Sequence, residues 1–223
     1  MSGSDERPSG LPLLRALIRT HAGHEAADWL DEQVQQLGEP PDRTRFRVAF
    51  ARAGRKLGDR PLADEQAELR SWTMRDLGRA VLLLEALRTS SDDEQVSLVD
   101  HVFRTGELGE QQSVVRVLAR LPKPERFAPL AAEATRTNAM GVFEALACDN
   151  PYPGRHMSDL AFNQMVMKAI FNEISVTRIL GLRERTTPEL VRIAQDYASE
   201  RRAAGRPVPA DVAVIEDWLE QRS

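Results

Sequence analysis

The chain has 223 residues, of which 42% are hydrophobic, 29% charged and 5% aromatic, and its formal net charge is −4. This length allows one large domain or two small ones, with a core that needs no disulfide or metal to hold it. The charge, from 30 basic and 34 acidic residues, gives no strong field of either sign, which argues against bulk nucleic-acid binding. Scarce aromatic residues and abundant alanine and leucine favour helices over sheets.

The start of the chain predicts neither secretion nor membrane insertion. Residues 1–10 are polar, lack the basic-then-apolar order of a signal peptide, and are predicted to form a disordered leader. The apolar run Leu11 to Ile18 contains Arg15 and is too short to span a bilayer. We therefore expect a cytoplasmic protein, with residues 11–223 as a single all-helical domain and no direct membrane insertion.

Helical periodicity continues along the rest of the chain, interrupted by proline and glycine. The expected helices are a hairpin up to Leu37, a basic helix capped by Asp42, the apolar run 77–87, a helix opened by the capping box Ser91 to Glu94, 110–121, two helices on either side of Asn138, 159–172, 188–203 and 209–221. No segment alternates as a strand would. Short helices joined by short breaks predict an all-α fold built as a HEAT/TPR-like α-solenoid, with a compact helical bundle as the alternative.

Common catalytic signatures are missing from the sequence. It contains no glycine-rich phosphate loop, no nucleophile elbow and no cysteine quartet for zinc. His21 and His24 could share a metal, although an exposed helix start is the favoured interpretation, so we expect no metal and no cofactor. Cys148 lies in an apolar run and is predicted to be a small buried hydrophobe rather than a nucleophile.

The helix expected over 159–172 combines apolar residues on nearly all faces with a few isolated polar ones. The apolar pattern predicts a central, buried helix. Its Lys168 needs a partner, because an unpaired buried charge is costly. Glu144, alone in the preceding apolar helix, is the expected partner.

These isolated polar residues allow two interpretations. They can line a polar pocket for a small molecule or for a partner's tail, or they can form an internal hydrogen-bond network that fixes helix register. The loop 150–154, with two prolines, is expected to be a rigid corner that presents Tyr152. No catalytic residue is assigned. The candidate ligand- or partner-binding residues are Arg136, Asn138, Glu144, Asp149, Asn150, Tyr152, His156, Asn163, Gln164, Lys168 and Asn172.

Several segments of the second half of the chain also carry a family resemblance. They are 106–112, Thr137-Asn138 with Phe143-Glu144-Ala145, 149–153, 162–169, Gly181-Leu182 and 196–206. Together they resemble the EboA family over roughly residues 106–206. One departure falls at Glu173, where the family pattern leads us to expect a small residue.

The resemblance implies a place in a small bacterial gene cluster linked to making or exporting secondary metabolites. That cluster also encodes a metal-dependent hydrolase-like protein and a prenyltransferase-like membrane protein, which are the expected partners besides a small metabolite. It supplies no catalytic residues. The favoured function is therefore a non-catalytic helical scaffold or ligand- or partner-binding protein. The alternative is an enzyme or accessory subunit that acts on a small-molecule precursor through Glu144 and Lys168.

Overall fold

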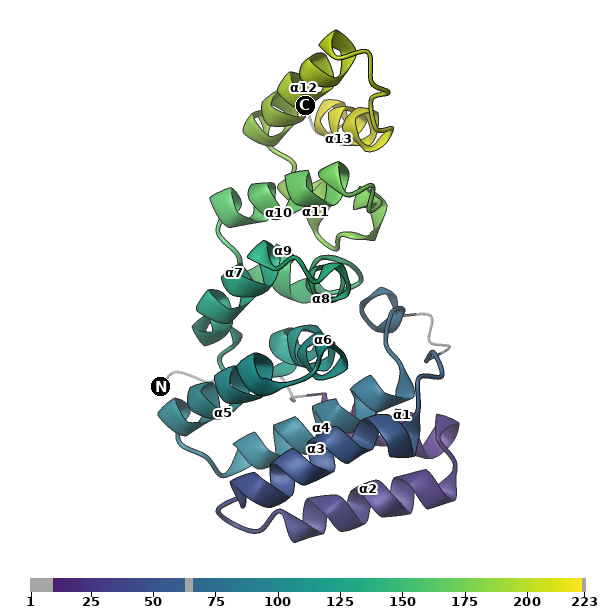
Figure 1. Cartoon of the computed structure of the whole chain (residues 1–223), viewed down its shortest axis with the longest axis vertical. Helices are drawn as coiled ribbons and strands as arrows, with labels where there is room; N and C mark the ends of the chain where they lie inside the picture. The colour runs from purple at the N-terminus through teal and green to yellow at the C-terminus, as the bar shows by residue number, and fades with distance from the viewer. Residues whose placement is uncertain (1–9, 63–65, 222–223) are drawn as a thin grey trace.

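The computed structural model describes residues 10–62 and 66–221, and this part of the chain is all-α, with thirteen α-helices and no strand. Apart from Gly10, which precedes the first helix, the predicted leader lies outside the described residues. The N-terminal helices lie at one end of an elongated molecule and the C-terminal helices at the other (Figure 1). The all-α fold class is confirmed, while the distinction between a superhelix and a bundle stays a prediction.

Four helices make up the N-terminal end of the molecule (Figure 1). They are α1 (Leu11–His21), α2 (His24–Gln36), α3 (Arg43–Leu57) and α4 (Met74–Arg88). Asp42 caps α3 as predicted, its side chain accepting a hydrogen bond from the backbone N–H of Arg45 at 2.9 Å. Because α4 packs against α1, α2, α3 and α6, its apolar run is buried on most faces, which also agrees with the sequence.

The connection between α3 and α4 leaves this bundle and packs against later helices. It contains the short 3₁₀ helix η1 (Ala67–Leu69), and we refer to residues 66–73 as the 66–73 segment. Leu69 and Trp72 are buried, and the guanidinium of Arg120 lies 5.7 Å from the Trp72 ring. The segment therefore reaches the helices that follow α5.

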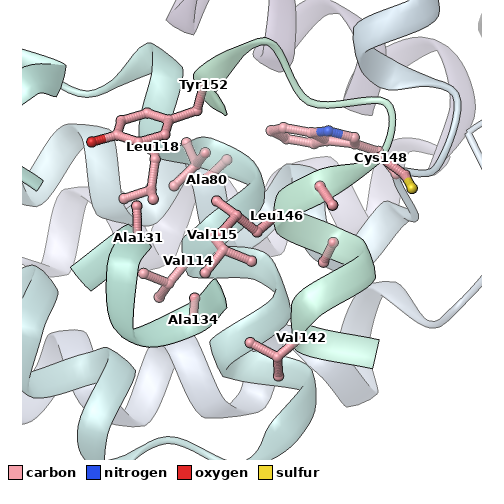
Figure 2. Close-up of a cluster of buried hydrophobic side chains, with 14 of the residues drawn as sticks. Ala80, Val114, Val115, Leu118, Ala131, Ala134, Val142, Leu146, Cys148 and Tyr152 are labelled. Atoms are coloured by element: carbon pink, nitrogen blue, oxygen red, sulfur yellow. The ribbon is translucent and has the colours of Figure 1, made fainter. Parts of the chain in front are cut away.

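The middle of the molecule contains α5 (Asp92–Thr105), α6 (Leu108–Val117), η2 (Leu118–Arg120), η3 (Pro124–Phe127), α7 (Ala128–Arg136) and α8 (Met140–Ala147). The predicted capping box at Ser91 and Glu94 opens α5. Side chains from α4, α6, α7 and α8 meet in one apolar cluster (Figure 2). The labelled members are Ala80, Val114, Val115, Leu118, Ala131, Ala134, Val142, Leu146, Cys148 and Tyr152.

The C-terminal part contains α9 (Pro151–His156), α10 (Asp159–Phe171), η4 (Val176–Arg178), α11 (Leu182–Arg185), α12 (Pro188–Ala203) and α13 (Asp211–Glu220). Thr187 caps α12, and α13 packs back against α12, which places helices where 188–203 and 209–221 were predicted. The expectation that α10 is buried all round is wrong at its ends, where Leu160 is 71% and Phe171 52% exposed.

The expected loop 150–154 is instead the start of a helix, α9. Asn150 is its N-cap, accepting from the backbone N–H of Tyr152 at 2.9 Å, and Pro151 is its first residue. Proline fits the first turn of a helix because the N–H groups there have no intrahelical acceptor. The two prolines therefore start α9 rather than prevent it.

Candidate functional site

A polar pocket lies where α6, α8, η4 and the 66–73 segment meet. It encloses about 150 Å³ and is lined by Ser71, Gln112, Arg116, Gly141, Glu144, Ala145 and Arg178. We refer to it as the α6–α8 pocket. Glu144 is the one predicted site residue in its lining.

The α8 side of the pocket is held by an ion cluster around Arg178. Its Nη1 donates to Glu144 Oε1 at 2.5 Å, and its Nε and Nη2 donate to Asp149 Oδ2 at 3.2 and 2.7 Å. Burial lowers the pKa of the Arg178 guanidinium, but its hydrogen bonds to the Asp149 and Glu144 carboxylates outweigh this effect and leave that pKa above its ordinary value. The Arg178 guanidinium therefore stays charged, and it joins Asp149, which is only 2% exposed, to the partly exposed Glu144.

Arg178 thus takes the place that the sequence assigned to Lys168, so the predicted pairing of Glu144 with Lys168 is wrong. Lys168 Nζ instead donates to the backbone carbonyls of Thr135 at 2.7 Å and Thr137 at 2.6 Å, and it lies 4.6 Å from the Phe143 ring centroid. These carbonyls end α7, where the helix dipole favours a cation. Burial lowers the pKa of Lys168.

The α6 side of the pocket rests on a buried polar network that the sequence analysis missed. Arg116 Nη1 donates to Asp76 Oδ2 at 3.1 Å, and Ser113 Oγ donates to Asp76 Oδ1 at 2.7 Å. The backbone N–H and hydroxyl of Thr73 also bond to Asp76. Arg79 extends the network to the Gly109 carbonyl at 2.7 Å, and burial lowers its pKa. A signal for it was present, since Asp76 and Arg79 are charged residues within an apolar helix.

Two buried polar atoms of the pocket-lining residues have no hydrogen-bond partner in the described structure. They are Ser71 Oγ and Arg116 Nε. Among the other lining residues, Gly141 leaves room for Gln112, because a Cβ at this position would lie 2.4 Å from Gln112 Nε2. The pocket therefore combines unused hydrogen-bonding capacity with space that a bulkier residue at 141 would remove.

Asn150 and Tyr152 have structural partners. The Asn150 amide donates to the carbonyls of Val115 at 2.9 Å and Ala145 at 3.1 Å, which ties α6 and α8 to the start of α9. Tyr152 is not displayed at the surface of this corner, because it is fully buried and its hydroxyl donates to the Pro124 carbonyl at 3.1 Å, while a role in binding stays a prediction. Burial raises the pKa of Tyr152.

The remaining predicted residues do not line the α6–α8 pocket. Arg136 and Asn138 are exposed around the end of α7, and Gln164 and Asn172 are exposed on α10 and at its end. Asn163 is buried in α10. His156 is half-buried with its ring centroid 5.1 Å from that of Tyr152, and burial lowers its pKa. Whether any of these residues binds a ligand or partner stays a prediction.

His21, His24 and Cys148 do not line the α6–α8 pocket. His24 is the exposed first residue of α2, and His21 ends α1. In the described ranges, no group of three or more His, Cys, Asp and Glu side chains is arranged to hold a metal ion. Cys148 is buried as predicted, and burial raises the pKa of its thiol to about 12.

Within residues 10–62 and 66–221, none of the helices has the length and apolar character needed to cross a bilayer. Searches of curated proteins and of solved structures gave no match. The family model described as "Metabolite traffic protein EboA" matches residues 11–215. The match covers both the N-terminal bundle and the helices that form the α6–α8 pocket, so it extends well before the segments that carried the resemblance. The chain belongs to the EboA family.

Proposed function

We propose that this protein is a non-catalytic, cytoplasmic helical binding protein that takes part in metabolite traffic by holding a small metabolite in the α6–α8 pocket. The observation that carries the proposal is the pocket itself, whose lining residues Ser71 and Arg116 have buried polar atoms without a partner. Buried polar atoms are normally hydrogen-bonded, because leaving them unpaired costs about 1–3 kcal/mol each. A bound ligand, with small movements of these side chains, supplies the missing partners.

The size of the pocket fits a small ligand. Its volume of about 150 Å³ equals roughly five water molecules at about 30 Å³ each. This is enough for a small molecule or for one end of a longer one. Because Gln112 and Glu144 are both partly exposed, such a longer molecule can extend from the pocket into solvent.

A non-catalytic role agrees better with the contacts of Glu144 and Lys168 than the alternative enzyme does. Acid–base catalysis by this pair requires both groups within hydrogen-bond reach of one substrate. Glu144 is bonded to Arg178, whereas Lys168 is occupied by the carbonyls that end α7. The alternative therefore has no geometric support from these two residues.

The family description, which names metabolite traffic, supports an interaction with a small metabolite. We propose that the partners are the hydrolase-like and prenyltransferase-like proteins that the resemblance implies. The helical stack offers surfaces on which such partners can dock while the pocket holds the metabolite.

The proposal is tested by purifying the protein from its native host and identifying bound small molecules by mass spectrometry. A Gly141→Leu variant should fold, because Gly141 lies inside α8, but its side chain should fill the pocket. Ala51→Leu adds similar bulk on the exposed face of α3 and is the matched control. We expect a small molecule bound to the wild type and to Ala51→Leu but lost from Gly141→Leu. Equal recovery from all three proteins would rule out this pocket.

A further inference from the structure

We propose that the α6–α8 pocket recognises an oxyanion group, a carboxylate or a phosphate, on its small-molecule ligand. This inference rests on the proposed function and adds the chemistry of the group that is bound. It follows from the free hydrogen-bond donors in the pocket lining and from the way the nearby charges are paired.

Several hydrogen-bond donors in this lining are free in the described structure. Arg116 forms one hydrogen bond within the described residues, to Asp76, so most of its guanidinium donors remain unused. The Ser71 hydroxyl has no partner, and the structure gives no hydrogen bond for the Gln112 side chain. A lining with several free donors favours a ligand group that accepts several hydrogen bonds at once.

The charges around the lining are paired, so the inference rests on free donors and not on an excess of positive charge. The lining contains two guanidinium groups and one carboxylate, that of Glu144, and Arg178 is bonded both to Glu144 at 2.5 Å and to Asp149 at 2.7 Å. Outside the lining, the Asp76 carboxylate accepts hydrogen bonds from Arg116, Thr73 and Ser113. Arg178 is thus engaged by two carboxylates, and the unused donors of Arg116 are the guanidinium donors left for an incoming oxyanion.

The same network also fixes the orientation of Arg116. The salt bridge to the fully buried Asp76 holds one edge of the planar guanidinium. A guanidinium held in this way presents its other donors in the fork geometry that matches carboxylate and phosphate oxygens. Asp76 thus acts as a positioning residue, and Arg116 and Ser71 are the expected binding residues.

Isothermal titration calorimetry tests the inference, with sodium acetate and inorganic phosphate as separate probes and with chloride keeping the ionic strength constant. We expect saturable binding of at least one probe, and the stronger binder identifies the group. Ser71→Ala should weaken binding about tenfold through loss of one hydrogen bond to a charged group. Its hydroxyl has no partner in the structure, so the variant should fold normally. Ser199→Ala, on the exposed surface of α12, is the matched control.

Two results would overturn the inference: no saturable binding of either probe, or binding that Ser71→Ala leaves unchanged. Arg116→Lys provides a second variant, because lysine keeps a charge for Asp76 but lacks the fork, and it should also weaken binding. The experiments distinguish failure of the proposed function from failure of the oxyanion inference. If Gly141→Leu loses a host metabolite but neither probe binds the wild type, the proposed binding function stands and the oxyanion inference is wrong. Binding of the probes without any host metabolite would retain the oxyanion chemistry and remove the proposed role in metabolite binding.

Discussion

At the scale of single residues, Arg178 decides the electrostatics of the candidate site. It joins Glu144 near the surface to Asp149 in the interior, while Lys168 is bonded to carbonyls at the end of α7. Glu144 and Lys168 therefore have no partner in common.

This separation predicts the result of a double-mutant cycle. Glu144→Leu and Lys168→Met should lower the free energy of unfolding additively, within about 0.5 kcal/mol, because residues without shared partners do not couple. Lys168→Met should itself lose roughly 1–2 kcal/mol through its two hydrogen bonds to carbonyls. Urea denaturation of the four proteins measures these values. A coupling energy above about 1 kcal/mol would show that the two charges do interact.

Glu173 gives a second prediction at this scale. Its φ of 57° lies in the left-handed region, which glycine adopts without strain and glutamate does not. Glu173→Gly should therefore raise the free energy of unfolding by about 0.5–1 kcal/mol. Thermal unfolding measures the change, with Glu173→Ala as the control that removes the carboxylate but not the strain. An equal gain from both variants would assign the effect to charge instead.

The left-handed backbone at Glu173 also explains why the family pattern leads one to expect a small residue at this position.

At the scale of elements, the short helix α9 depends on the side chain of Asn150. This side chain forms three hydrogen bonds, one to the start of α9 and two to carbonyls of α6 and α8.

Asn150→Asp should therefore be strongly destabilising although aspartate has almost the same shape and caps helices well. The carboxylate loses both amide donors and places a buried negative charge against two carbonyl oxygens. We expect a loss of about 3 kcal/mol or more, and a smaller loss for Asn150→Ala. Equilibrium unfolding of both variants checks the order. A variant Asn150→Asp as stable as wild type would mean that the amide hydrogen bonds are not formed.

The elements also show what a sequence can and cannot predict. Long helices with clear caps, such as α3, α5 and α12, were predictable because the signals are local. The helix α9 was not, because its prolines resemble those of a loop until the cap at Asn150 is known. The partner of Glu144 was also hidden, since Arg178 is 34 residues away and lies in a short 3₁₀ helix without periodicity.

At the scale of the whole molecule, the helices at the C-terminal end of the stack have fewer neighbours than those of the N-terminal bundle (Figure 1). The buried network of Asp76, Arg79 and Ser113 links α4 with α6 and so connects the N-terminal bundle to the rest. At the other end, α12 packs chiefly against α10 and α13.

Stability should therefore be uneven along the stack. We expect amide hydrogen exchange to be slowest in α4 and clearly faster in α12, which has 16 residues to the 15 of α4. The two helices have nearly the same length, so length does not explain a difference in exchange. Exchange measured by mass spectrometry checks this, and uniform protection would indicate a single cooperative unit.

The burial of Cys148 has a practical consequence for labelling. It is the only cysteine in the chain, it is enclosed, and desolvation raises its thiol pKa to about 12, so thiol reagents do not meet a thiolate at neutral pH. A cysteine introduced at the partly exposed Gln112 would then be the one reactive thiol on the native protein. A fluorophore or spin label can thus be attached beside the pocket without replacing any native cysteine.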